Sequence, residues 1–199
     1  MTEGLRERKK EAQRKAIAGA AMGLFGERGF DAVTVAEVAA RAGTSVQTVF
    51  NYYPTKEDLM LWGRKRHEEE LLRAVRERGP GVPVLDAVEA RVRQAAVEMS
   101  AVPAEIREKF GRIVRSAPTL LARFRSLGAE TELELARILA ADTGVAETDP
   151  RPRLVAAALM SLAQLAYGEP GAKNGQFPRI EAGFALLRDG IAGYATREG

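Results

Sequence analysis

Apolar residues recur along most of this chain at steps of three and four, the spacing of one face of an α-helix. The first such stripe lies between Lys10 and Arg28 and comprises Ile17, Ala20, Ala21, Leu24 and Phe25. No convincing alternation of the kind that marks a β-strand appears. The pattern predicts an all-α protein, with a small three-helix head at the N-terminus, a long connecting helix and a larger helical domain after it.

Two short helices with strong end signals follow the first one. Thr34, with Glu37 three residues later, has the capping-box pattern, in which each side chain binds a backbone N–H of the helix start. Gly43 favours the left-handed conformation that ends a helix, Ser45 can cap the next helix, and Pro54 ends that one. Two short helices across a glycine turn predict a helix-turn-helix, whose second helix lies in the major groove of DNA.

The second of these helices, from Val46 to about Tyr53, divides into two faces. Val49 and Tyr53, with Phe50 beside them, are predicted to face inward. The residues left to face outward are Val46, Gln47, Thr48, Asn51 and Tyr52. Glutamine and asparagine can each make a bidentate pair with adenine, and the methyl groups of valine and threonine can touch a thymine methyl.

This order of residues resembles the TetR family of one-component transcriptional regulators. Members carry a glycine turn, a short recognition helix, an aromatic run and then Pro-Ser/Thr-Lys-Glu; residues 43–59 here read GTSVQTVFNYYPTKEDL. Upstream, residues 24–35 (LFGERGFDAVTV) resemble the end of the family's first helix. The family usually has a tyrosine where this chain has Phe50, and its hydroxyl often meets a phosphate. We therefore expect Tyr52 and Lys56 to anchor the DNA backbone.

The predicted DNA-binding domain covers residues 1–56, and residues 57–199 form the predicted ligand-binding and dimerisation domain. The residues predicted to bind DNA are Thr34, Ser45, Val46, Gln47, Thr48, Asn51, Tyr52 and Lys56. The first 56 residues hold nine Lys/Arg and six Asp/Glu, so the whole net charge of +3 lies in this part.

Residues 1–9 are polar and expected to be loose. Their charges Arg6, Arg8 and Lys9 fit either a solvated helix start or a basic arm along phosphates.

A long helix is predicted from Thr55 to about Arg78, because no helix breaker appears before Gly79. In the resembled family this helix carries the signal between ligand and DNA. It also holds His67, the only histidine, and a lone histidine on a helix is more often a solvated or core residue than a ligand.

Prolines mark the helix starts of the second domain, at Pro83, Pro103 and Pro118. Such breaks favour helices that cross at angles, and the gaps between them can hold an apolar ligand; a filled core is the alternative. Residues 112–120 (RIVRSAPTL) resemble a subgroup of the family whose ligands are acyl-type lipophilic molecules. The residues predicted to bind the ligand are Trp62, Met99, Phe110, Ile113, Phe124 and Leu127.

The last two predicted helices differ from the others. Residues 152–168 are apolar or small nearly all round, and the final helix has a seam with steps of four and three residues. In the resembled family these two helices form a four-helix bundle with those of a twin subunit; the alternative is that the seam closes the monomer core. The predicted dimer residues are Leu159, Leu162, Ile180, Phe184, Leu187 and Ile191, and Tyr194 continues the seam.

Composition narrows the function further. The absence of cysteine excludes disulfides, thiolate metal sites and cysteine nucleophiles, and no signal peptide or membrane span is evident, so we expect a cytoplasmic protein. With one histidine and no HExxH, GxSxG or glycine-rich phosphate motif, we expect neither an enzyme nor a metal or cofactor site. The sequence predicts a repressor that binds an inverted-repeat operator as a homodimer and is released by a small lipophilic effector. A ligand-dependent activator and a helical protein-interaction adaptor are the alternatives.

Overall fold

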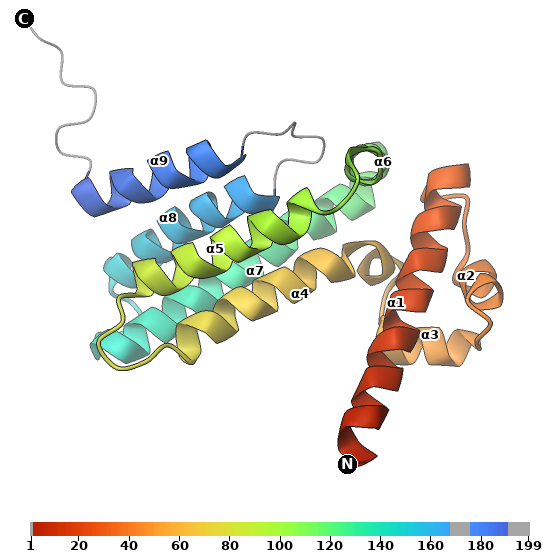
Figure 1. Cartoon of the computed structure of the whole chain (residues 1–199), viewed down its shortest axis with the longest axis horizontal. Helices are drawn as coiled ribbons and strands as arrows, with labels where there is room; N and C mark the ends of the chain where they lie inside the picture. Colours follow the sequence, from red (N-terminus) through yellow and green to blue (C-terminus); the bar gives the residue numbers. More distant parts are fainter. Residues whose placement is uncertain (1, 168–175, 191–199) are drawn as a thin grey trace, which may run out of the picture. The chain divides into compact units, whose positions relative to one another are not determined.

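The computed structural model describes residues 2–167 and 176–190, which form nine helices and contain no strand (Figure 1). The helices are α1 (Thr2–Arg28), α2 (Val35–Arg41), α3 (Val46–Tyr52), α4 (Lys56–Arg76), α5 (Val84–Ser100), α6 (Ala104–Ser116), α7 (Pro118–Thr143), α8 (Pro150–Tyr167) and α9 (Gln176–Asp189). The predicted all-α class is confirmed.

The helices pack into two compact units. The first comprises Met1–Arg66 with Glu105–Leu127, and the second comprises His67–Ala104 with Gly128–Gly199. Helices α4 and α7 therefore contribute residues to both units. The predicted boundary at residue 56, between a DNA-binding and a ligand-binding domain, stays a prediction.

The first unit contains the predicted three-helix head. The apolar stripe of α1 is buried there, and Phe30, just after the helix, packs on Phe25 with the ring centroids 5.0 Å apart. Val38 of α2 and Val49 of α3 are fully buried in the same core. One expectation is wrong: residues 2–9 are not loose, because α1 already begins at Thr2.

The predicted end signals act as expected. Thr34 and Glu37 form a complete capping box, and Ser45 caps α3 by accepting a hydrogen bond from the backbone N–H of Thr48 at 3.0 Å. At the start of α4, Thr55 and Asp58 each accept a hydrogen bond from the other's backbone N–H, both at 3.1 Å. These bonds satisfy N–H groups that a helix start otherwise leaves without a partner. Between α2 and α3, Gly43 has φ = +62°, the left-handed conformation that the turn requires.

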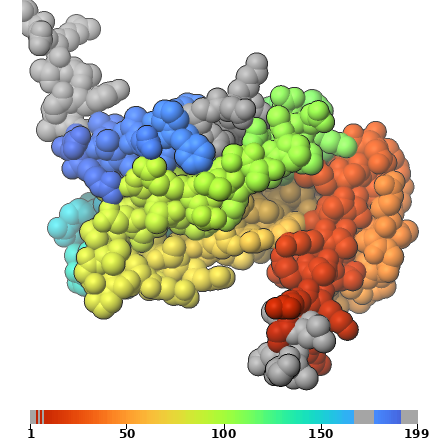
Figure 2. Space-filling model, in the orientation of Figure 1, coloured from red at the N-terminus to blue at the C-terminus, as the bar shows by residue number. Residues whose placement is uncertain are grey.

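The second unit is built on α5, α8 and α9, which pack against one another. Figure 2 shows α9 (blue) lying beside α5 (yellow-green) on one face of this unit. Gly183 of α9 lies close against α8, since a Cβ at that position would be 2.4 Å from Cδ2 of Leu162 and would force that side chain to shift. Glu68 is a buried carboxylate of this unit, and it accepts a hydrogen bond from Thr131 at 3.1 Å.

The seam predicted to face a twin subunit instead lies inside this unit. Leu159, Leu162, Ile180 and Phe184 are buried in the core of the single chain, and Leu187 packs against that core. The helical spacing of these apolar residues is as predicted. The face that they form packs within the chain, where α8 and α9 contact each other and α5. A partner chain would therefore have to meet other faces of these helices. Ile191 and Tyr194 lie outside the described residues.

In the ranges that the structure describes, no helix combines the length and the apolar character needed to cross a membrane.

The burial of Phe184 gives a direct test of this core. Phe184→Ala should lower the free energy of unfolding by about 3–5 kcal/mol, because the side chain is 1% exposed and its loss leaves a cavity. Phe50→Ala removes the same atoms from a side chain that is 42% exposed and should cost about 1 kcal/mol or less. Chemical denaturation at one protein concentration compares the two variants. Equal losses would contradict the placement of Phe184.

The capping box of α2 makes the head sensitive to acid. The pKa of Glu37 is lowered from 4.5 to about 2, first by the hydrogen bond that the carboxylate accepts from the backbone N–H of Thr34 and then by Arg28, whose Nη1 lies 2.5 Å from Glu37 Oε1. A folded-state pKa below the unfolded value means that ionised Glu37 stabilises the head above pH 4.5 and that this contribution is lost as the pH falls toward 2.

We therefore expect Glu37→Gln to lower the melting temperature at pH 6–7, and the gap to the unchanged protein to close as the pH falls from about 4.5 to about 2. Glu147→Gln, a substitution at an exposed loop position, is the control and should show no such pH-dependent gap. Thermal melts followed by circular dichroism across this range measure the effect. A gap for Glu37→Gln that stays constant with pH would contradict the assignment.

Candidate nucleic-acid interface

The orientation of α3 is set by two buried residues one helical turn apart. Val49 is fully buried and Tyr53, directly after the helix, is 3% exposed. The Tyr53 hydroxyl donates a hydrogen bond to the backbone carbonyl of Arg14 on α1 at 2.9 Å. Burial raises the pKa of the Tyr53 phenol far above its usual value, so the hydroxyl stays protonated and keeps donating. Val49 and Tyr53 thus hold one face of α3 against the apolar core of the head.

The opposite face of α3 is open to solvent. Gln47 and Asn51 are exposed, as predicted, and their side-chain amides are joined by a hydrogen bond from Gln47 Nε2 to Asn51 Oδ1 at 3.1 Å. Both residues stand four positions apart on one helix, so the bond holds the two amides side by side. This arrangement presents two groups that are suited to adenine edges.

Phe50 does not face inward, and that prediction is wrong. Its side chain is 42% exposed, as Val46 is at 40%. The reason is geometric: Val49 and Tyr53 already fill the inward face, and the next residue along a helix turns about 100° away from it. Val46 and Phe50 therefore form an apolar strip beside Gln47 and Asn51, a suitable surface for thymine methyl groups.

A hollow of about 520 Å³ lies between the start of α1 and the helix-turn-helix. Its lining residues are Arg6, Lys9, Lys10, Gln13, Thr44, Thr48 and Tyr52. Cationic, hydroxyl and amide groups of this kind are the ones that bind phosphate oxygens. Because α1 extends to Thr2, the basic N-terminal residues lie beside the recognition helix rather than apart from it.

The sequence identified part of this lining. Thr48 and Tyr52 were predicted, and the basic residues were left open between a helix start and a basic arm; the structure makes them helical. Gln13 and Thr44 were missed. Gln13 stands four residues after Lys9, so the helical period was the signal that could have found it. Tyr52 also lies under a cation, with the Arg14 guanidinium carbon 5.7 Å from its ring centroid.

Four of the residues predicted to contact DNA make hydrogen bonds within the head. The Thr34 hydroxyl binds Glu37 at 2.8 Å, and the Ser45 and Thr48 hydroxyl oxygens are 2.8 Å apart. The Lys56 ammonium donates to the backbone carbonyl of Asp31 at 3.4 Å and lies 4.4 Å from the ring centroid of Phe30. Lys56 thus ties the start of α4 to the loop after α1, and the DNA contacts of all these residues stay predictions.

The predicted ligand-binding residues are divided between the two units. Ile113 and Leu127 are buried in the core of the first unit, and Trp62, Phe110 and Phe124 are partly buried and pack against that core. The Arg64 guanidinium carbon lies 4.0 Å from the ring centroid of Phe124. Met99 belongs to the second unit. Five of the six positions thus belong to or pack on one apolar cluster, and their role in ligand binding stays a prediction.

Comparison with known proteins agrees with this geometry. Residues 17–61 match the model of the bacterial regulatory proteins of the tetR family, and residues 82–192 match the MftR C-terminal domain. The chain is 30% identical over 174 residues to the HTH-type transcriptional regulator TcmR of Streptomyces glaucescens, an alignment that covers 83% of this chain and 76% of TcmR.

Solved structures give the same result. A TetR-family regulator from Streptomyces coelicolor A3 is 28% identical with a TM-score of 0.51, and the match covers 89% of this chain and 93% of that one. Salmonella enterica GusR shares the fold at 17% identity with a TM-score of 0.55, over 89% and 94% of the two chains. This protein therefore belongs to the TetR family of transcriptional regulators, which bind DNA through a helix-turn-helix.

Proposed function

We propose that this protein is a repressor that binds an inverted-repeat operator as a homodimer and is released by a small-molecule effector. The observation that carries the proposal is the exposed pair Gln47 and Asn51 on a helix held from behind by Val49 and Tyr53. A rigid helix with exposed amides next to a basic hollow is suited to DNA and has no evident use in an adaptor.

The two parts of the interface have different roles in this proposal. The basic residues of the hollow bind phosphates, which supplies much of the affinity and makes it depend on salt. Gln47, Asn51 and the strip of Val46 and Phe50 contact base edges and determine the sequence preference.

Dimerisation is supported by apolar side chains that the second unit leaves exposed. On α8, Leu154 is 67% and Val155 is 43% exposed, and on α9 Phe177 is 38% exposed. We propose that these faces, in place of the buried seam, meet the same faces of a twin chain around a twofold axis. Two heads related in this way would read two half-sites, which explains why an inverted repeat is expected.

Effector control requires that the effector bind the DNA-competent and the released conformations with different affinity. Helix α4 is the covalent route for this coupling, because it begins at the Thr55–Asp58 cap of the head and continues past His67 into the second unit. We propose a small lipophilic effector that shifts this helix. Repression follows when the effector-free form occupies the operator.

The residue that decides sequence preference gives the test. Duplexes selected from a random pool by the unchanged protein define the operator. Gln47→Ala should reduce the ratio of operator affinity to random-duplex affinity by about 10- to 100-fold, because one bidentate base contact contributes discrimination of this size. Its affinity for random duplexes should stay the same, because the phosphate contacts remain.

Gln94→Ala, which removes an exposed amide from α5, is the matched control and should leave the ratio unchanged. Fluorescence anisotropy at fixed salt measures both affinities, and circular dichroism verifies the fold. An operator preference that survives Gln47→Ala and also Asn51→Ala would refute α3 as the reading element.

A further inference from the structure

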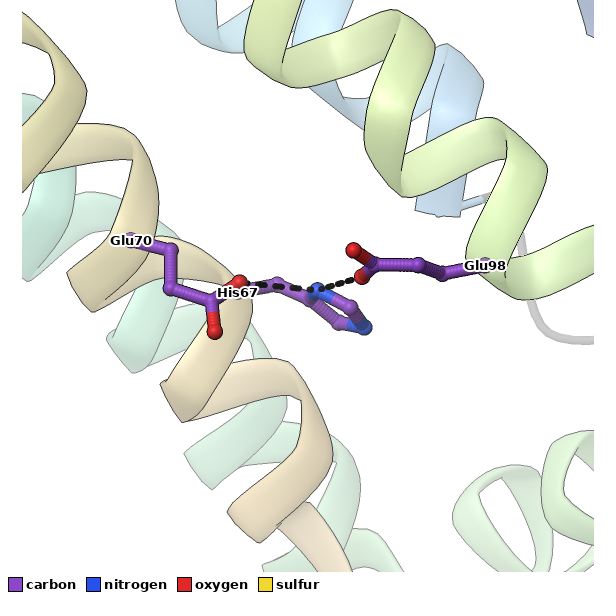
Figure 3. A group of neighbouring side chains, drawn as sticks. All are labelled: His67, Glu70 and Glu98. Carbon is purple, nitrogen blue, oxygen red and sulfur yellow. Dashed lines mark ion pairs between the residues drawn. The ribbon is translucent and has the colours of Figure 1, made fainter.

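Three side chains from two helices of the second unit converge on one place. His67 and Glu70 project from α4 and Glu98 from α5, and their nearest ligand atoms all lie within 4.8 Å of one another (Figure 3). His67 Nδ1 is 3.8 Å from Glu70 Oε2 and 3.5 Å from Glu98 Oε2. The cluster is half-buried, and Glu98 is its most open member at 36% exposed. A solute can therefore reach it from the side of Glu98.

A cation already lies at the centre of this group. Arg91 of α5 places Nη2 2.8 Å from His67 Nδ1, 2.5 Å from Glu70 Oε2 and 3.3 Å from Glu98 Oε2. A guanidinium can only donate, so His67 Nδ1 accepts and exposes a lone pair toward this point. All three ligand atoms thus direct electron pairs at one shared position.

The hydrogen bonding of Arg91 is poorly matched to this position. Nη2 carries two hydrogens but faces three acceptors. The other three N–H hydrogens of the group are on Nε and Nη1, and within the described part of the chain these buried nitrogens have no hydrogen-bond partner. The side chain is only 9% exposed, so water does not readily replace the missing partners. The guanidinium is therefore held through Nη2 alone, by charge attraction and the hydrogen bonds of that one nitrogen.

The charges of the cluster favour a cation over an anion. Two carboxylates and one guanidinium meet at this point, beside an imidazole nitrogen that accepts a hydrogen bond. An added anion would meet both carboxylates, whereas a divalent ion that displaced Arg91 would neutralise them. The displaced guanidinium would then be free to satisfy its N–H groups in water.

We propose that His67, Glu70 and Glu98 form a binding site for a first-row divalent metal ion such as Zn²⁺ or Co²⁺, with Arg91 as the internal cation that the metal replaces. One nitrogen and two oxygen ligands suit these ions. Bond lengths of about 2.0–2.2 Å separate neighbouring tetrahedral ligands by about 3.3–3.6 Å, so small side-chain shifts complete the site. The ion would join α4 to α5 within the second unit. This site does not depend on the proposed DNA function.

The test uses the full chain without a histidine tag, titrated with ZnCl₂ by calorimetry and with CoCl₂ by visible absorption. We expect one ion per chain and cobalt d–d bands of low-symmetry coordination. Glu98→Gln should weaken binding at least about tenfold. Glu69→Gln, an exposed neighbour of Glu70 on α4, is the matched control and should bind as the unchanged protein does.

A second variant tests the role of Arg91 and should change the metal affinity in the opposite direction. Arg91→Gln removes the competing charge and should tighten Co²⁺ binding at least about tenfold, a gain that a mere ion-pair network would not give. Absence of uptake up to millimolar metal, or uptake that is unaffected by Glu98→Gln, would overturn the proposal. So would one-to-one binding of inorganic phosphate that is lost in Arg91→Gln, since the cluster would then be an anion site.

Discussion

The rotation of α3 about its own axis is the constraint on which the DNA-facing surface depends. Val49 and Tyr53 are buried together, and the Tyr53 hydroxyl is bonded to the backbone of α1. With that face fixed, the period of the helix determines that Gln47, Asn51, Val46 and Phe50 are outside. A rotation of one residue would turn Val49 out of the core, and exposing a fully buried apolar side chain of this size costs about 1.5–3 kcal/mol. The exposed face that we propose to read DNA is therefore set by apolar contacts on the buried side of the helix.

Local chemistry explains what could be predicted from the sequence. The starts of α2, α3 and α4 follow from Thr34, Ser45 and Thr55, because a capping side chain bonds to backbone only two or three residues away. Such short-range bonds need no knowledge of the rest of the fold. The same is true of Gly43, whose positive φ depends on its own lack of a side chain.

Tertiary packing explains what could not be predicted. The spacing of apolar residues in α9 predicts that Ile180 and Phe184 share a face. Spacing alone does not determine whether that face packs on the same chain or on a partner. Phe50 is apolar, yet the inward face of a seven-residue helix has little room beyond Val49 and Tyr53. The cluster around His67 was likewise hidden, since Arg91 and Glu98 come from another helix more than twenty residues away.

We propose that the head reads DNA sequence, and one titration tests this most directly. Labelled duplexes that tile the DNA upstream of this protein's own gene, with shuffled versions of each, are titrated by fluorescence anisotropy at two salt concentrations. We predict one duplex that binds at least about 10³-fold more tightly than its shuffled version at both salts. Equal, weak and steeply salt-dependent binding to every duplex would leave only the phosphate contacts and would contradict the account.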